Sequence, residues 1–242
     1  MSAVAKAVAA ESPLLRCDPA SIRQALDANG YAVLRDVFDR GECRQVAASY
    51  DDDALFRSRV VMARHGFGRG EYKYFAYPLP ERIAELRAAL YESTSDIANR
   101  WNESMHIDTR YPAAYAEYLE RCHRLGQARP TPLLLRYAAG DYNCLHQDLY
   151  GEEVFPLQMA ILLAAPDEDF TGGEFVLTEQ RPRMHSRVHV VPLGQGDAVV
   201  FPVHHRPVPG KRGVYRVNMR HGVSEVRTGS RSTLGIILHD AT

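Results

Sequence analysis

The sequence is poor in cysteine and contains no long apolar run. Four cysteines occur among 242 residues, at positions 17, 43, 122 and 144. None belongs to a Cys-x-x-Cys pair, which argues against a disulfide framework and against a structural zinc site. No apolar stretch approaches the roughly 20 residues that span a bilayer, and residues 1–12 lack the apolar core of a secretory signal. We therefore predict a cytoplasmic protein with no membrane partner, beginning with a frayed or weakly helical tail.

The chain also has little net charge, −1 at pH 7, so its bulk charge does not suggest nucleic acid binding. The charges are unevenly distributed, however. Residues 141–180 contain nine Asp and Glu and no Lys or Arg, whereas residues 181–231 contain ten Lys and Arg and two acids. This asymmetry fits an anionic ligand on the second segment, and it equally fits ordinary solvated strand faces.

The two halves of the chain have different patterns. In residues 1–131, capping residues and amphipathic spacing predict helices, while residues 56–80, rich in Arg, Gly and Tyr, have the composition of a long functional loop. In residues 132–242, short β-rich runs separated by turn residues are typical of a jelly roll. We predict one α+β domain, residues 1–242, with N-terminal helices packed on a cupin-like double-stranded β-helix. The expected helices are 18–29, 39–50, 81–101 and 111–125, and the expected strands are 31–38, 133–137, 143–148, 157–164, 173–177, 188–192, 198–203, 214–221 and 232–239.

Residues 133–148 are the strongest candidate for carrying chemistry. They predict a strand, a turn and a second strand that ends in His146-Gln147-Asp148. Alternate side chains of a strand share a face, so His146 and Asp148 are expected to point the same way, with Cys144 as a small buried neighbour. An imidazole and a carboxylate in one cavity are two of the three ligands of a facial Fe(II) site. A second copy of the pattern, His106-Ile107-Asp108, follows a long helix, so we prefer the copy at 146–148.

The third ligand has to come from a distant strand. The residues alone leave six candidates open. A lone histidine in a strand is more often a packed or surface residue than a ligand, so only several residues in the right order can decide between them. The candidates are His185, His189, His204, His205, His221 and His239.

Several motifs after residue 132 resemble those of the Fe(II)/2-oxoglutarate-dependent dioxygenase superfamily. Arg136-Tyr137-Ala138 followed by Leu145-His146-Gln147-Asp148 is similar to the AlkB-type nucleic-acid dealkylation enzymes. Over its length the chain most resembles a bacterial family of oxygenases presumed to act on alkylated nucleic acid. The motifs are His146-x-Asp148, Thr171-Gly172-Gly173-Glu174, Gly196-Asp197-Ala198-Val199-Val200-Phe201, His221-Gly222-Val223 and Arg231-x-Thr233.

The resemblance implies a set of site residues and cofactors. In this superfamily a basic residue at a set spacing after the distal histidine anchors the far carboxylate of 2-oxoglutarate, and among the candidates only His221 has one, Arg231, ten residues later. The implied catalytic metal ligands for Fe(II) are therefore His146, Asp148 and His221. The implied residues for 2-oxoglutarate are Arg231, Thr233 and Tyr137.

The implied enzyme is an oxidoreductase, a dioxygenase that uses O2 and couples decarboxylation of 2-oxoglutarate to succinate with hydroxylation of a C–H bond. Hydroxylation of an N-methyl group in damaged nucleic acid would be oxidative demethylation. The same residues would also serve a hydroxylase of a small molecule or of a protein side chain. A non-catalytic cupin-like binding protein is the third alternative, and the complete residue set argues against it.

The substrate is expected to be selected outside the metal site. Residues 64–77 are a candidate lid in which Arg69, Tyr72, Lys73 and Tyr74 could stack on a base and touch phosphate. A packed structural loop is the alternative. The sequence predicts neither the natural substrate nor an oligomeric state.

Overall fold

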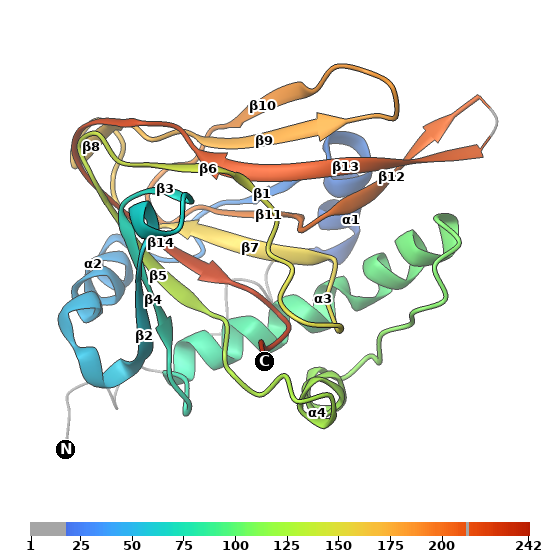
Figure 1. Ribbon diagram of the computed structural model, residues 1–242, viewed down its shortest axis with the longest axis horizontal. Coiled ribbons are helices and arrows are strands. Elements are labelled where there is room, and N and C mark those ends of the chain that lie inside the picture. The colour runs from blue at the N-terminus through green and yellow to red at the C-terminus, as the bar shows by residue number, and fades with distance from the viewer. Residues whose placement is uncertain (1–17, 212) are drawn as a thin grey trace.

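The computed structural model describes residues 18–211 and 213–242 (Figure 1). The predicted N-terminal tail, residues 1–12, lies outside the described residues, as does Cys17. Among the described residues, Cys43, Cys122 and Cys144 are free thiols. None of the described helices is long and apolar enough to cross a membrane.

Two antiparallel sheets face each other and form the core of the molecule (Figure 1). The larger sheet has the order β1-β11-β7-β14-β5-β4-β2, with β8 paired to β14, and the smaller has the order β10-β9-β13-β6-β3, with β12 paired to β13. This is the predicted α+β jelly-roll architecture. The strands are β1 (Ala32–Leu34), β2 (Phe56–Val61), β3 (Gly68–Arg69), β4 (Glu71–Phe75), β5 (Leu133–Ala138), β6 (Tyr142–His146), β7 (Leu157–Leu162), β8 (Phe170–Gly172), β9 (Phe175–Gln180), β10 (Arg187–Val191), β11 (Ala198–Pro202), β12 (His205–Gly210), β13 (Gly213–Val223) and β14 (Val226–Ile236).

The helices begin where the sequence provides capping groups. Asp18 accepts hydrogen bonds from the first free backbone N–H groups of α1, which ends at Gly30 in the left-handed conformation. Asp39 and Glu42 form a reciprocal capping box at the start of α2. The helices are α1 (Pro19–Asn29), α2 (Arg40–Ala48), α3 (Glu81–Ser104) and α4 (Tyr115–Arg124), with short 3-10 turns η3 (Ser49–Asp51), η4 (Asp53–Leu55) and η5 (Met62–Arg64).

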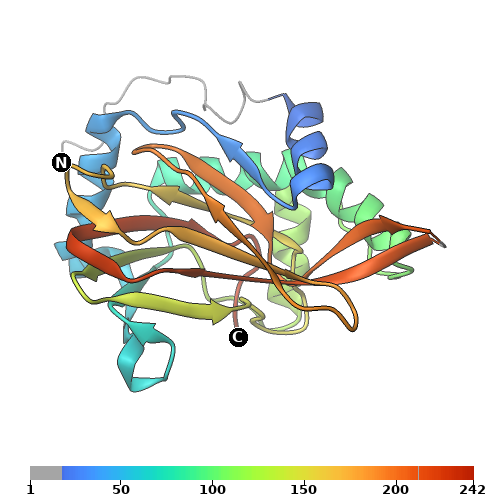
Figure 2. The same cartoon turned by 90° about the horizontal axis from the view of Figure 1, so that it is seen from above.

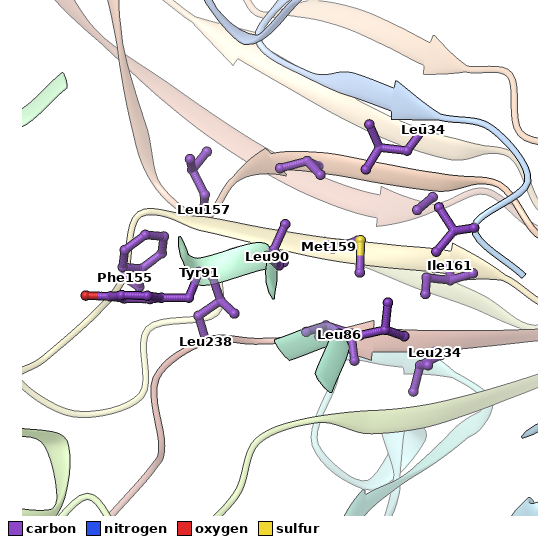
Figure 3. Packing of buried hydrophobic residues seen from close by; sticks show 14 of the residues in the cluster. Leu34, Leu86, Leu90, Tyr91, Phe155, Leu157, Met159, Ile161, Leu234 and Leu238 are labelled. Carbon is purple, nitrogen blue, oxygen red and sulfur yellow. The ribbon is translucent and has the colours of Figure 1, made fainter. Parts of the chain in front are cut away.

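Helix α3 covers the outer face of the larger sheet and builds the main hydrophobic core (Figures 1 and 3). Figure 3 shows Leu86 and Leu90 of this helix against Met159 and Ile161 of β7 and Leu234 of β14. Because side chains alternate across a strand, the residues between these ones point into the space between the two sheets. The same strands therefore build the core with one face and the interior site with the other.

The prediction of a long loop at residues 56–80 is wrong. The segment forms β2, β3 and β4, and β4 lies inside the larger sheet between β2 and β5. Lys73 faces the helical side, where its ammonium binds the carbonyl of Tyr50 and the carboxylate of Asp53. The charged and glycine-rich composition hid these strands because the partners that neutralise the charge are distant in sequence.

Strand β12 was also absent from the predicted set. It contains Pro207 and Pro209, which cannot donate to a sheet and which argue against a central strand. The strand pairs with β13 and extends it into a long hairpin (Figure 1). Proline is tolerated here because β12 is an edge strand.

Candidate iron and 2-oxoglutarate site

A β-bulge shapes the strand that carries the first metal-ligand candidate. His146 pairs with His221 of β13, whereas Asn143 pairs with Val223. An advance of three residues along β6 therefore matches an advance of two residues along β13, which is a β-bulge with one extra residue in β6. The extra residue breaks strict alternation and leaves Cys144 exposed. The expectation that Cys144 is buried beside the site is therefore wrong, because it assumed an unbroken alternation that the bulge interrupts.

The structure brings His146, Asp148 and His221 together, as the sequence predicts. Their ligand atoms all lie within 4.8 Å of one another. The Asp148 oxygens lie 3.6 Å from His146 Nε2 and 3.4 Å from His221 Nε2. Two imidazoles and one carboxylate are the donor set that suits non-haem Fe(II). The second His-x-Asp, at 106–108, follows α3 and contributes nothing to this cluster.

The backbone of the bulge orients the imidazole of His146. Its Nδ1 lies 2.7 Å from the carbonyl oxygen of Cys144. A carbonyl can only accept, so Nδ1 carries the proton and the lone pair of Nε2 points into the cluster. This is the tautomer that binds a metal through Nε2.

The electrostatics of the cluster keep its donors in their metal-binding forms. Burial lowers the pKa of His146, and the neighbouring His221 lowers it further. Burial acts to raise the pKa of Asp148, but its interactions with His221 and His146, together with the hydrogen bond from Tyr150, outweigh burial and lower it. A neutral imidazole and an ionised carboxylate are the forms that bind a cation.

The residues proposed for 2-oxoglutarate lie together in the interior between the sheets. Arg231 of β14 pairs with Tyr137 of β5, and the exposed fraction of each side chain is 1%. The guanidinium of Arg231 donates to Thr233 Oγ1 at 2.5 Å and lies 5.6 Å from the centre of the Tyr137 ring. The family resemblance implied this group of three, and the structure places Thr233 and Tyr137 each beside Arg231.

Arg231 forms no ion pair with any described residue. Its Nε has no hydrogen-bond partner among the described residues, and no carboxylate in that part of the chain forms an ion pair with it. Burial lowers the pKa of Arg231 to about 10. Because an unpaired buried charge is costly, this arrangement fits a pocket that binds an anionic group.

The backbone approaches two of these residues closely. A Cβ at Gly173 would come within 2.9 Å of Arg231 Cδ, and one at Gly70 would come within 2.9 Å of the Tyr137 ring. Both glycines also have positive φ, 60° and 104°. Glycine at these two positions therefore lets the backbone between β3 and β4 pack against Tyr137 and the turn before β9 pack against Arg231.

Sequence reasoning missed three side chains of the site. Asn143 Nδ2 donates to Tyr137 Oη at 3.3 Å, while Tyr150 and Gln158 both donate to Asp148. Tyr150 follows the ligand pair by two residues, a spacing that could have drawn attention. Asn143 and Gln158 gave no such signal, because their roles depend on the bulge and on pairing between distant strands.

The four substrate candidates lie in different places. The expectation that Lys73 contacts substrate is wrong, because its ammonium is buried against Tyr50 and Asp53 on the helical side. Tyr74 is not a surface platform either, since only 8% of it is exposed. Tyr72 is half-buried and points inward beside Tyr74, with ring centres 5.3 Å apart. Arg69 is exposed on the projecting turn between β2 and β4 (Figure 2).

Comparison with solved structures defines the class of fold. A prolyl hydroxylase from Trichoplax adhaerens, in complex with a hypoxia inducible factor peptide fragment, aligns with a TM-score of 0.55 over 90% of this chain and 88% of that one, at 14% identity. A Pseudomonas putida prolyl-4-hydroxylase aligns with a TM-score of 0.53 over 93% and 100%, also at 14% identity. The chain has the fold of these hydroxylases.

Sequence comparison then shows the family. Residues 70–241 match the family described as "Oxygenase, catalysing oxidative methylation of damaged DNA". An uncharacterized protein of Mycobacterium tuberculosis is 46% identical over 193 residues, which cover 78% of this chain and 83% of that protein. The chain belongs to this oxygenase family. It is therefore an oxidoreductase, as its site residues had indicated.

Proposed function

We propose that the protein is an Fe(II)- and 2-oxoglutarate-dependent dioxygenase that oxidatively demethylates alkylated nucleic acid. The observation that carries the proposal is the pairing of a His146–Asp148–His221 donor cluster with a buried Arg231 that forms no ion pair among the described residues. The first suits Fe(II) and the second suits the far carboxylate of a dicarboxylate co-substrate. Membership of the oxygenase family supports the reaction class.

In this proposal, His146, Asp148 and His221 hold the metal. Bound iron supplies the activation of O2 that couples decarboxylation of 2-oxoglutarate to hydroxylation of a C–H bond. The chain contributes a neutral His146 with Nε2 directed into the cluster, and a carboxylate that stays ionised.

Arg231, Thr233 and Tyr137 bind the far carboxylate of the co-substrate. Thr233 Oγ1 accepts from Arg231, so its own proton remains to be donated to the ligand. Tyr137 Oη accepts from Asn143, which leaves its proton free in the same way. Burial raises the pKa of Tyr137 to about 12, so the phenol keeps that proton at neutral pH. One cation and two hydroxyl donors then meet one carboxylate.

The substrate side of the proposal rests on the family description and on the turn between β2 and β4. Strand β3 of this turn pairs with Tyr142 and Asn143 of β6, the strand that ends at His146. The turn exposes Arg69 and about half of Phe67, a cation and an aromatic ring that suit phosphate and base. Tyr72 lines the interior behind them. We further propose that this activity operates in the cytoplasm, which a nucleic acid substrate would favour.

Two assays test the proposal in sequence. The Fe(II)-loaded protein should convert 2-oxoglutarate to succinate, and a His146→Ala variant should not. Equal succinate formation by both proteins, or none by the wild type, would overturn the dioxygenase assignment. The wild type should then release formaldehyde from N-methylated single-stranded oligonucleotides and not from unmethylated ones. Succinate coupled to hydroxylation of a metabolite or peptide, without formaldehyde from the oligonucleotides, would replace the nucleic acid substrate.

A further inference from the structure

Each oxygen of Asp148 faces one histidine and accepts one hydrogen bond. Oδ1 lies 3.6 Å from His146 Nε2 and accepts from Tyr150 Oη at 2.8 Å. Oδ2 lies 3.4 Å from His221 Nε2 and accepts from Gln158 Nε2 at 2.9 Å. The carboxylate is therefore held on both sides, with its plane fixed between the two imidazoles.

The two donors are neutral, and this matters for a metal ligand. No Lys or Arg among residues 18–211 and 213–242 forms an ion pair with Asp148. A cation in either position would compete with a metal ion for the negative charge, whereas a phenol and an amide orient the oxygens and leave the charge available. Because an ionised carboxylate can only accept, it also dictates that Gln158 presents its N–H side and that Tyr150 donates its hydroxyl proton.

Asp148 needs such support because the strand does not provide it. Strand β6 ends at His146, so the backbone of Asp148 lies beyond the last paired residue. Gln147, between the two ligands, is anchored separately: its amide donates to Asn218 and to the carbonyl of Met219, both at 2.7 Å. The rotamer of Asp148 is left to its own side-chain contacts.

The two donors are themselves rigidly placed, and they come from different parts of the fold. Gln158 belongs to β7 in the larger sheet, opposite β6, and is 2% exposed. Tyr150 lies in the segment after β6, where its ring packs at right angles to Tyr74, with centres 6.5 Å apart, and beside His239. Gln158 therefore ties Asp148 to the larger sheet, while Tyr150 holds it from within the segment after β6.

We propose that Tyr150 and Gln158 are positioning residues that hold the Asp148 carboxylate in its metal-binding orientation. The inference rests on the proposed function, because it assigns these residues a role toward the metal. Neither residue belongs to the motifs by which the sequence resembles the Fe(II)/2-oxoglutarate-dependent dioxygenases. Loss of such outer hydrogen bonds typically weakens metal binding by about 10- to 100-fold.

The test compares Tyr150→Phe and Gln158→Met, which remove one donor each and keep the size of the side chain. Tyr91→Phe is the matched control, because Tyr91 Oη donates to the carbonyl of Pro112 at 2.7 Å, in the helical core. Co(II) is titrated into the full chain by calorimetry, and the visible absorption of bound Co(II) is recorded. We expect each site variant to bind Co(II) about 10- to 100-fold more weakly with altered absorption bands, and Tyr91→Phe to match the wild type.

The outcomes separate this inference from the proposed function. Unchanged affinity and unchanged Co(II) spectra in both site variants would overturn the positioning role while the metal site stands. Equal Co(II) binding by the wild type and a His146→Ala/His221→Ala variant would instead overturn the metal site itself. Thermal melting of each variant without metal shows whether it is folded, and because two variants act on different oxygens, either one alone can refute the role assigned to its donor.

Discussion

Two buried arginines, Arg87 and Arg231, behave in opposite ways. Each is 1% exposed. Arg87, on α3, donates to the carbonyl of Ile237 at 2.8 Å and to the carboxylate of Asp240 at 2.7 Å, and it also reaches Tyr77 and Thr131. Arg231 donates to Thr233 alone among the described residues.

The surroundings shift the two guanidinium groups in opposite directions. Burial acts to lower the pKa of Arg87, but Tyr115 and Asp240 outweigh it and the pKa is raised. Burial lowers the pKa of Arg231 to about 10, and its neighbours do not restore it. A buried charge that the protein satisfies itself serves the fold, and a buried charge left without a partner marks a place for a ligand.

The largest expected effect is on stability at Arg87. Arg87→Met would leave the Asp240 carboxylate buried without its arginine, which should cost about 3–5 kcal/mol of unfolding free energy. Arg231→Met removes a charge that has no counter-ion, so it should cost less than about 1 kcal/mol or stabilise the fold. Urea denaturation without ligands measures both. Equal losses in the two variants would remove the distinction between the arginines.

The next effect is on co-substrate binding at Arg231. With Mn(II) bound, Arg231→Met should weaken the binding of 2-oxoglutarate by roughly 2–5 kcal/mol, which is at least about 30-fold in affinity, because the far carboxylate loses its cation. Arg227→Met is the control, since Arg227 is an exposed arginine paired at the surface with Glu174. Calorimetric titration with 2-oxoglutarate separates them. Wild-type affinity in Arg231→Met would assign the buried charge to some other ligand.

A pH effect should appear on the Arg87 side of the molecule. His239 is fully buried, and its Nδ1 accepts from the backbone N–H of Phe155 at 3.3 Å. Burial, followed by the charge of Arg87, lowers the pKa of His239 from 6.5 to about 4. Between these values the unfolded chain binds a proton that the folded chain does not, so stability falls as the pH drops from about 6.5 to 4, by about 3 kcal/mol at most.

The variant His239→Asn tests this dependence, because its amide oxygen can still accept from Phe155. Denaturation midpoints between pH 7 and pH 4 should change less in His239→Asn than in the wild type, with acid titration of the carboxylates common to both. Parallel curves would mean that His239 does not contribute to acid sensitivity.

The smallest expected effects concern one tyrosine beside each arginine. Tyr137→Phe should weaken the binding of 2-oxoglutarate by about 1 kcal/mol, because the variant lacks one hydroxyl donor to the ligand, and it should leave the stability nearly unchanged. Tyr77→Phe should lower stability by about 1–2 kcal/mol and leave 2-oxoglutarate binding unchanged, because Tyr77 Oη donates to the buried carboxylate of Asp240 at 2.9 Å. Titration with 2-oxoglutarate and urea denaturation of both variants test this. A loss of stability in Tyr137→Phe, or weaker 2-oxoglutarate binding in Tyr77→Phe, would contradict the prediction.

Local patterns predicted the parts of the molecule that local physics decides. The caps at Asp18 and Asp39 mark the starts of α1 and α2, and alternating apolar runs mark most strands of the jelly roll. The pairing of His221 with Arg231 came from spacing known in a related superfamily, not from composition. Local patterns did not predict the strands that contain Lys73 and Pro207. The carboxylate that neutralises Lys73 and the edge position that tolerates Pro207 are both set by residues distant in the chain.

The sequence by itself determined which chemical groups are available: a His-x-Asp at 146–148, a distal His221, and an arginine ten residues after it. Only the tertiary structure decided how they are used. The bulge in β6 orients His146 and exposes Cys144, and strand pairing brings Gln158 of one sheet to Asp148 beside the other. The physical reason is that hydrogen bonding and desolvation depend on contacts between segments far apart in the chain, and these contacts leave no local pattern.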